Sequence, residues 1–320
     1  MNVVDLFCGC GGLSLGFETA GFNVVAGYDN WTAAINVYKL NFSHTINQID
    51  LSNVEESSKH IAAYNPDMII GGPPCQDFSS AGLRNEDNGR GNLTVCYAGI
   101  VSKVRPTWFV MENVATITKT NKLAGAKTIL KEAGYGLTET VLNAALCGVP
   151  QKRKRFFLIG KLGAKDNFLL PYIVQNLSFK EMTVKDYFGD KIDFQYYYRH
   201  PRSYARRGVF SVDEPSPTIR GVNRPIPNGY PLHKNDPVDS LEGIRPLTTK
   251  ERSMIQTFPE SYKFVGSKSE IEQMIGNAVP VNLGKFVASS IKDYIDKRPV
   301  EYEKVATVCR PCLFDLDEYI

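Results

Sequence analysis

The amino-acid sequence predicts an α/β protein, with a parallel sheet between helices and a second, smaller, loop-rich domain. Short apolar runs typical of buried strands alternate with segments of helical periodicity from Asn2 to about Phe168. A glycine-rich turn, Gly9–Gly12, separates the first strand from the first helix, as at the start of nucleotide-binding α/β units. Beyond Phe168 the alternation stops, and prolines, tyrosines and arginines take over.

The composition is that of a globular protein of one or two domains. The chain has 320 residues, of which 43% are hydrophobic, enough for a sizeable core. No apolar run approaches the roughly 18 residues that cross a membrane, and the start, Met1–Asp5, lacks the basic and apolar segments of a signal peptide. We therefore expect a cytoplasmic protein with no membrane partner. The net charge of +3 does not by itself predict binding to nucleic acid.

Seven cysteines, an odd number, are expected to be reduced in that compartment. Cys309 and Cys312 have the spacing of a metal-binding pair, but no second pair of cysteines or histidines accompanies them. We therefore expect no metal. The stretch from Pro299 has no periodicity and ends in acidic residues, which predicts a loosely packed tail.

The elements of the first domain follow from the apolar pattern. Strands are predicted at 2–7, 22–28, 46–49, 68–70 and 107–111, and helices at 13–20, 31–41, 54–64, 95–104 and 123–133. Two more strands, 136–142 and 156–160, are predicted as a hairpin at the end of the sheet. Later, a helix begins near Thr248 with Glu251 in a capping-box arrangement, and a turn at 274–280 precedes a final helix at 281–295.

Two aspartates end predicted strands, where ligands bind in open α/β sheets. Asp29 follows the second strand and can accept hydrogen bonds from ribose hydroxyls, and Asp50 follows the third and can accept from an adenine amino group. Helix capping or a solvent-facing position is the alternative for each. The third glycine of a dinucleotide fingerprint is displaced here, which weakens an interpretation as a nicotinamide-dependent protein.

The stretch Gly71–Ser79 stops the fourth strand with two glycines and two prolines and places Cys75 on a loop at its carboxyl end. A cysteine held by proline-fixed backbone is a candidate nucleophile when ionised. An inert, buried thiol after a turn is the alternative. Glu112 ends the fifth strand and faces the same edge of the sheet.

Two basic segments are candidates for contact with a polyanion. In 151–155 the residues alternate, so Gln151, Arg153 and Arg155 share one face of an extended segment; a solvated charge cluster is the alternative. In 196–207 tyrosines and arginines interleave at a density that suits contacts with phosphates and bases. An ordinary surface patch over buried tyrosine rings is the alternative there.

Six stretches resemble, in sequence and in order, the motifs of the DNA cytosine-5 methyltransferase family, bacterial restriction-modification type, and they span nearly the whole chain. They are Asp5–Gly12 (cofactor loop), Pro73–Ser79 (Pro-Pro-Cys-Gln-x-Phe-Ser, nucleophile loop), Glu112–Val114 (catalytic glutamate), Gln151–Arg155 (Gln-x-Arg-x-Arg), Arg245–Pro259 and Gly276–Val279.

This resemblance implies a Rossmann-like, S-adenosylmethionine-dependent methyltransferase sheet at 1–175 plus 270–320 and a small target-recognition domain at 176–269. It implies methyl transfer to C5 of a flipped-out cytosine in a specific double-stranded DNA sequence, leaving S-adenosylhomocysteine. Cys75 would add to C6, Glu112 would act at N3, and Arg155, with Arg153, would donate to O2. The sequence does not identify the base that removes the C5 proton.

The resemblance also implies a fuller set of site residues, some of which the spacing already suggests. The cofactor would contact Phe7, Gly9, Gly11, Gly12, Asp29, Asn30, Asp50, Leu51, Pro74, Leu93, Asn277 and Ala278. DNA would contact Gln76, Ser79, Arg84, Arg90, Gln151, Arg199, Arg202, Thr218 and Arg220. The polar stretch after Cys75 would be a loop that closes on DNA.

The resemblance also implies a monomer, nucleoid-associated in use, that protects DNA from a partner restriction endonuclease. Two alternatives remain. The tRNA-methylating branch of the family carries a Cys-Phe-Thr tripeptide that is absent here. A cofactor-binding regulator or dehydrogenase would not need Cys75, Glu112 and Arg155 intact.

Overall fold

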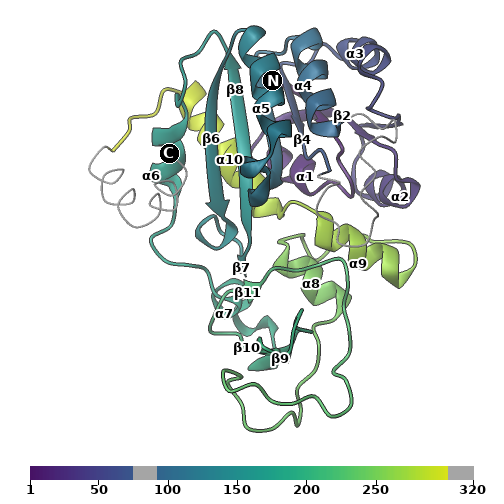
Figure 1. Cartoon of the computed structure of the whole chain (residues 1–320), viewed down its shortest axis with the longest axis vertical. Coiled ribbons are helices and arrows are strands. Elements are labelled where there is room, and N and C mark those ends of the chain that lie inside the picture. Colours follow the sequence, from purple (N-terminus) through teal and green to yellow (C-terminus); the bar gives the residue numbers. More distant parts are fainter. Residues whose placement is uncertain (75–91, 302–320) are drawn as a thin grey trace.

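The computed structural model describes residues 1–74 and 92–301, and its larger part is a seven-stranded sheet with helices on both faces (Figure 1). The strand order is β3-β2-β1-β4-β5-β8-β6. Neighbours from β3 to β5 are parallel, whereas β8 runs antiparallel to both β5 and β6. The bounds are β1 Asn2–Leu6, β2 Asn23–Asp29, β3 Thr45–Gln48, β4 Met68–Gly71, β5 Trp108–Val114, β6 Tyr135–Asn143 and β8 Lys154–Leu162. The predicted α/β class and the terminal hairpin are confirmed.

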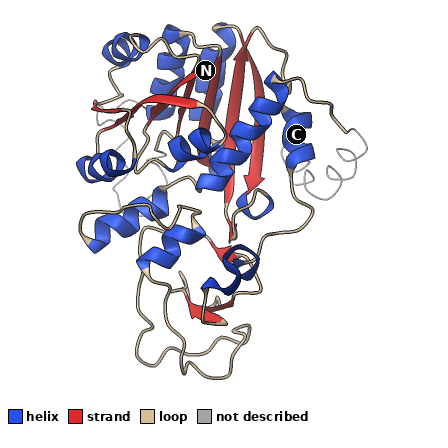
Figure 2. Ribbon diagram, turned by 180° about the vertical axis from the view of Figure 1, so that it is seen from behind, coloured by secondary structure: helices blue, strands red, loops and turns tan. Residues whose placement is uncertain are grey.

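Helices cover both faces because successive strand residues point to opposite sides. On β1, Val3 belongs to the core beneath one set of helices and Val4 to the core beneath the other. The first set is α1 Gly12–Thr19, α6 Leu170–Asn176 and α10 Val281–Ile295, of which α1 and α10 lie in front of the sheet in Figure 2. The second set is α3 Val54–Ala62, α4 Leu93–Val104 and α5 Asn121–Glu132.

A smaller, loop-rich part lies below the carboxyl end of the sheet in Figure 1. Its own core includes Val184, Tyr197, Phe210, Ile255 and Ile275. Its elements are α7 Val184–Phe188, β9 Tyr196–Tyr198, β10 Val209–Ser211, β11 Ser216–Pro217, α8 Thr249–Ile255 and α9 Lys268–Asn277. The strand β7, Gln151–Lys152, joins it to the sheet by pairing with β11.

The helix α2, Thr32–Asn41, packs on a further cluster that includes Cys10, Phe258 and Met274, so both parts of the chain contribute to it. None of the helices in the described ranges is long and apolar enough to span a membrane.

Two local predictions need correction. The stretch 274–280, predicted as a turn, is helical as far as Asn277, because Ser267 and Glu270 form a capping box that starts α9. Ser267 and Glu270 have the spacing of a capping box in the sequence itself. The strand predicted to end at Met111 continues to Val114, because β8 pairs with it up to Arg155. The capping box of Thr248 and Glu251 is confirmed.

The contact between α1 and α10 leaves no room for a side chain at Gly16. A Cβ there would lie 2.6 Å from the backbone oxygen of Val281 and 2.7 Å from the backbone nitrogen of Lys285. At Gly125, in α5, the nearest atom to such a Cβ would be 3.9 Å away.

These two helical glycines should respond oppositely to alanine. Gly16→Ala should lower the free energy of unfolding by about 1–3 kcal/mol, because it overpacks the contact between α1 and α10. Gly125→Ala should raise it by about 0.5–1 kcal/mol, because alanine restricts the unfolded chain at no steric cost. Urea unfolding followed by circular dichroism measures both, and equal effects would contradict the α1–α10 packing.

Candidate active site

A cavity of about 450 Å³ opens at the carboxyl ends of β1, β2, β4 and β5, the edge where ligands bind in this kind of sheet. Six stretches of the sequence form its wall. The wall residues are Asp5, Phe7–Cys10, Gly12, Leu13, Asp29–Trp31, Gly72–Pro74, Glu112–Val114, Arg153, Arg155, Met274 and Gly276–Val279.

The glycine-rich turn after β1 approaches the end of α9 very closely. A Cβ at Gly12 would lie 2.2 Å from the backbone oxygen of Val279. Phe7, Gly9 and Gly11 all have positive φ, which bends the chain sharply away from β1. The turn therefore presents backbone, rather than side chains, to much of the cavity.

Asp29 fastens this turn to the end of β2. Its Oδ2 accepts a hydrogen bond of 2.8 Å from the backbone N–H of Gly9, and its Oδ1 accepts one of 2.8 Å from Trp31. Burial raises the pKa of Asp29, and these backbone hydrogen bonds oppose the shift. A carboxylate can accept about four hydrogen bonds, so Asp29 retains the capacity to accept from a ligand as well.

Eight of the twelve predicted cofactor contacts lie in the cavity wall: Phe7, Gly9, Gly12, Asp29, Asn30, Pro74, Asn277 and Ala278. The other four do not. Gly11 lies against the ring of Phe42, Asp50 is exposed, Leu51 is buried in the core, and Leu93 begins α4.

Several wall residues were missed as site residues, namely Asp5, Cys8, Cys10, Leu13, Trp31, Pro73, Asn113, Met274 and Val279. Most belong to the motifs that the sequence displays, but a motif does not show which of its side chains face the ligand. Asn113 has a clear role, because its Nδ2 donates a 2.8 Å hydrogen bond to the carbonyl of Pro73. It thereby fixes the proline loop against β5.

Glu112 and Arg155 form a buried ion pair in the cavity wall. Arg155 Nε lies 2.9 Å from Glu112 Oε1, and Glu112 is 8% exposed. Burial raises the pKa of Glu112, although the charges of Arg155 and Arg153 oppose the shift. The carboxyl group is thus poised to hold a proton more readily than an exposed glutamate.

The two thiols of the wall are held neutral. Burial raises the pKa of Cys10 to about 12 and that of Cys8 well above its ordinary value. Cys75 follows Pro74 directly in the sequence but lies outside the described residues. The other predicted residues outside the described ranges are Gln76, Ser79, Arg84, Arg90, Cys309 and Cys312.

Arg153 is fully buried and joins three segments. Its Nη1 donates to the carbonyl of Ile219 (3.1 Å), and its Nη2 donates to those of Gly276 (3.0 Å) and Ala278 (3.0 Å). Although Arg153 also lies in the cavity wall, both terminal nitrogens are already engaged. Its geometry is that of a residue that positions the wall.

Gln151 is also in the interior, which corrects its predicted contact with DNA. Its Nε2 donates to Gln256 (2.8 Å), and its Oε1 accepts from the backbone N–H of Ile219 (2.9 Å). The predicted alternation is confirmed, but the shared face of Gln151, Arg153 and Arg155 points inward and leaves Lys152 and Lys154 exposed.

Removing the Arg153 guanidinium should leave the buried carbonyls of Ile219 and Gly276 without this donor, whereas the Ala278 carbonyl also accepts from Gln256 Nε2 (3.2 Å). Arg153→Met should therefore lower the free energy of unfolding by at least about 2 kcal/mol, since each unsatisfied buried acceptor costs about 1–3 kcal/mol. Lys165→Ala, an exposed change beside Gly136 at the far end of the sheet, should stay within about 0.5 kcal/mol. Denaturant unfolding tests both, and an unchanged midpoint for Arg153→Met would contradict this bonding.

An open hollow of about 510 Å³ adjoins the cavity and shares Val114 and Arg155 with it. Thr218 lies in this hollow, where its Oγ1 donates to the carbonyl of Lys152 (2.8 Å). The other lining residues are Ala115, Thr116, Asn143, Lys152, Lys154 and Glu181.

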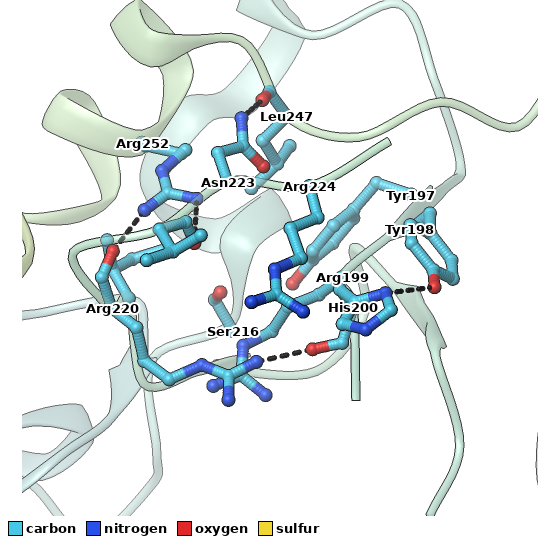
Figure 3. Close-up of a pocket in the computed structure, with 12 residues that line it drawn as sticks. Tyr197, Tyr198, Arg199, His200, Ser216, Arg220, Asn223, Arg224, Leu247 and Arg252 are labelled. Carbon is cyan, nitrogen blue, oxygen red and sulfur yellow. Dashed lines mark hydrogen bonds between the residues drawn. The ribbon is translucent and has the colours of Figure 1, made fainter. Parts of the chain in front are cut away.

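A basic surface lies in the smaller part of the chain, apart from the open hollow. There Arg199, Arg220 and Arg224 surround a small hollow with no carboxylate in its lining (Figure 3). Arg199 Nη2 donates to the carbonyl of Thr218 (2.7 Å), and Arg220 donates to that of His200. Burial and the nearby Arg220 lower the pKa of Arg199 to about 10. The predicted Arg202 is exposed nearby, so this is a surface of concentrated positive charge.

The sequence of residues 1–293 matches the family model described as C-5 cytosine-specific DNA methylase. This match covers most of the chain and identifies it as a methyltransferase. The chain belongs to the C-5 cytosine-specific DNA methylase family.

Two curated relatives are similar over nearly their whole length. The Type II methyltransferase M.HindV of Haemophilus influenzae is 58% identical over 301 residues, covering 94% of this chain and 99% of the relative. The Type II methyltransferase M.HgiDI of Herpetosiphon aurantiacus is 54% identical over 297 residues, covering 93% and 96%.

Among solved structures, S. pombe Dnmt2 methyltransferase is similar in fold, with a TM-score of 0.69 at 18% identity, covering 93% of this chain and 98% of that chain. The Entamoeba histolytica methyltransferase EhMeth has a TM-score of 0.63 at 18% identity, covering 93% and 98%. At these identities the likeness concerns the fold.

Proposed function

We propose that this protein transfers a methyl group from S-adenosylmethionine to C5 of a cytosine flipped out of a specific double-stranded DNA sequence, through a covalent bond between Cys75 and C6. The observation that carries the proposal is that Glu112 and Arg155 are paired in the wall of one cavity with the glycine-rich turn and the loop that leads to Cys75. The proposed acid Glu112, the proposed donor Arg155 and the glycine-rich turn thus lie around one cavity, beside Gly72–Pro74, which lead to Cys75.

The cavity suits this cofactor. Backbone groups of the turn at Gly9–Gly12 can approach a ligand closely, and Asp29 offers carboxylate oxygens for ribose hydroxyls. Phe7 and Trp31 supply apolar surface for the adenine ring. When bound, S-adenosylmethionine supplies a methyl group made electrophilic by the sulfonium charge, and its product is S-adenosylhomocysteine.

The chain's own residues make C5 reactive. The Cys75 thiolate forms a bond to C6 while Glu112 donates a proton to N3, so that C5 becomes enamine-like and nucleophilic. Arg155 donates to O2, where negative charge develops. After methylation N3 returns its proton to Glu112, a base removes the C5 proton, and the C6–S bond breaks with its electron pair on sulfur, which restores the Cys75 thiolate and the aromatic ring. The target cytosine has to leave the stack to reach this site.

The state of the other thiols supports Cys75 as the nucleophile. Burial holds Cys8 and Cys10 neutral in the cavity wall, and a neutral thiol is a poor nucleophile. Arg153 is assigned a supporting role, because its terminal nitrogens hold Ile219, Gly276 and Ala278.

The two basic hollows are proposed as the DNA surface, within a recognition domain at 176–269. Lys152, Lys154 and Thr218 flank the entrance beside Arg155 and would contact the strand near the flipped base. Arg199, Arg202, Arg220 and Arg224 would contact phosphates further along, because clustered guanidinium groups without carboxylates attract a polyanion. Gln76, Ser79, Arg84 and Arg90, which lie outside the described residues, are proposed as further DNA contacts on the family resemblance alone.

A tRNA substrate, as in the tRNA-methylating branch that the resemblance leaves as an alternative, is the second candidate, but the Cys-Phe-Thr tripeptide of that branch is absent from the sequence. The relatives above 50% identity are Type II methyltransferases. We therefore favour DNA, and protection against a restriction endonuclease as the cellular role of a monomeric, cytoplasmic enzyme.

The covalent step can be trapped. DNA with 5-fluorocytosine at the target carries fluorine where the proton would leave, and fluorine cannot leave as a cation. The protein should therefore form an adduct that survives denaturing electrophoresis and requires S-adenosylmethionine. Cys75→Ser should abolish the adduct, whereas Cys10→Ser should keep it, because the Cys10 thiol is held neutral.

Methyl transfer to ordinary DNA without trapping on the fluorinated target would refute covalent attack. Trapping that persists in Cys75→Ser would move the nucleophile elsewhere. Trapping on a tRNA in preference to DNA would establish the second candidate.

The salt dependence of DNA affinity should show whether these arginines contact phosphates. Arg202→Ala and Arg224→Ala should each weaken DNA binding for all sequences and reduce the slope of log affinity against log salt by about 1, as for one lost phosphate contact. Lys165→Ala, at the far end of the sheet, should leave the slope unchanged. Fluorescence anisotropy at several salt concentrations measures this, and a changed recognition sequence with an unchanged slope would instead assign these arginines to base edges.

A further inference from the structure

A buried chain of hydrogen bonds leads from the cavity wall to the protein surface, and none of the chemistry above uses it. Ser14 Oγ lies 2.6 Å from Asp5 Oδ2 and 2.7 Å from the hydroxyl of Tyr38. That hydroxyl lies 2.6 Å from His44 Nε2, and His44 Nδ1 lies 3.2 Å from Glu18 Oε1. Four short contacts thus connect a buried carboxyl group with a partly exposed one.

The inner end of this chain is a carboxyl group with unmet hydrogen-bonding capacity. Asp5 is 1% exposed and lies in the cavity wall, and its Oδ1 has no hydrogen-bond partner within the described residues. Burial raises the pKa of Asp5 to about 7; the hydrogen bond from Ser14 opposes this, and the charge of Asp29 adds to it. An acid in this state changes its charge in response to a nearby cation.

The fold makes room for the middle of the chain. Ser14 and Tyr38 are fully buried, on α1 and α2. A Cβ at Gly27, on β2, would lie 2.9 Å from the hydroxyl oxygen of Tyr38, so glycine is required there. Burial also raises the pKa of Tyr38, which keeps this hydroxyl protonated.

We propose that Asp5 is the counter-charge for the sulfonium of S-adenosylmethionine and that the chain Ser14–Tyr38–His44 moves a proton between His44 and Asp5 as that charge appears and disappears. The proposal rests on the proposed function, because it assumes this cofactor. It concerns how the protein distinguishes S-adenosylmethionine from S-adenosylhomocysteine.

The donor order defines the first state. Ser14 donates to Asp5, so the Tyr38 hydroxyl donates to Ser14 and, having used its proton, accepts from His44 Nε2–H. In the first state of the proposal His44 holds a proton on each ring nitrogen and is paired with Glu18, whose Oε1 lies 3.2 Å from Nδ1, and Asp5 is anionic.

The second state follows by shifting one proton along each link. Ser14 gives its proton to Asp5, Tyr38 gives its own to Ser14, and His44 gives the Nε2 proton to Tyr38. Asp5 is then neutral and donates to Ser14, Ser14 donates to Tyr38, and Tyr38 donates to His44 Nε2. His44 is then neutral and keeps the proton on Nδ1, the nitrogen that lies beside Glu18. No proton enters or leaves the protein.

The cofactor's charge selects between these states. A sulfonium cation in the cavity stabilises the Asp5 carboxylate, and loss of that cation on methyl transfer leaves a buried, uncompensated anion that takes up the proton. Other ionisable groups interact with the chain but do not replace this effect; they are Asp29, Cys8, Tyr97 and Glu18.

The protonation of His44 provides a direct readout in the intact protein. With ¹⁵N-labelled histidine, imidazole nitrogen shifts should show His44 protonated with S-adenosylmethionine and neutral with S-adenosylhomocysteine. The chain has four histidines, and His44→Gln identifies the signal. Ser14→Ala should make the His44 signal indifferent to which form is bound, whereas Ser290→Ala, a buried helical serine elsewhere, should preserve the difference.

Calorimetry supplies the second measurement. Asp5→Asn should weaken binding of S-adenosylmethionine roughly 10- to 1000-fold more than binding of S-adenosylhomocysteine, as for a carboxylate that loses a nearby cation. Should Ser14→Ala fail to fold, Tyr38→Phe breaks the same chain, with Tyr135→Phe as its buried control.

The outcomes separate the two levels of the argument. If neither cofactor form binds, the proposed function fails. If both bind and the His44 signal is the same with each, or if Asp5→Asn affects both affinities equally, the proton chain is refuted while the cofactor assignment stands.

Discussion

The buried guanidinium of Arg153 is the interaction on which the arrangement of the two parts depends. It holds the carbonyls of Gly276 and Ala278, which belong to the cavity wall, and that of Ile219, which belongs to the smaller part. Burying a cation is costly, and here hydrogen bonds to three carbonyls and the nearby Glu112 offset the cost. The cavity wall and the basic surface are thus positioned by one side chain.

A single physical effect, removal from water, gives the cavity's ionisable groups different roles. It raises the pKa of the Cys8 and Cys10 thiols, which makes them inert. It also raises that of Glu112, but Arg155 holds this carboxyl group in place 2.9 Å away, which suits a proton donor. Partners, rather than burial alone, therefore decide which group can react.

The sequence predicts much of this arrangement because strand ends converge in an α/β sheet. Asp29 and Glu112 follow buried runs, so their meeting in one cavity could be expected before any coordinates. The inward orientation of Gln151 could not be predicted in this way, because it depends on the pairing of β7 with β11. In that pairing Gln151 lies opposite Ser216, which is 65 residues further along the chain. The link from Asp5 to His44 is likewise tertiary, since it crosses three elements.

The segment 151–155 shows how one periodicity serves two purposes. Successive residues of an extended chain face opposite ways, so Gln151 and Arg153 bond to the interior while Lys152 and Lys154 line the open hollow. The backbone of this segment then fixes the distance between the buried side chains of Gln151 and Arg153 and the lysines of the open hollow. A shift of the strand register by one residue would bury Lys152 and Lys154 and expose Gln151 and Arg153, so the pairing of β7 with β11 is strongly specified.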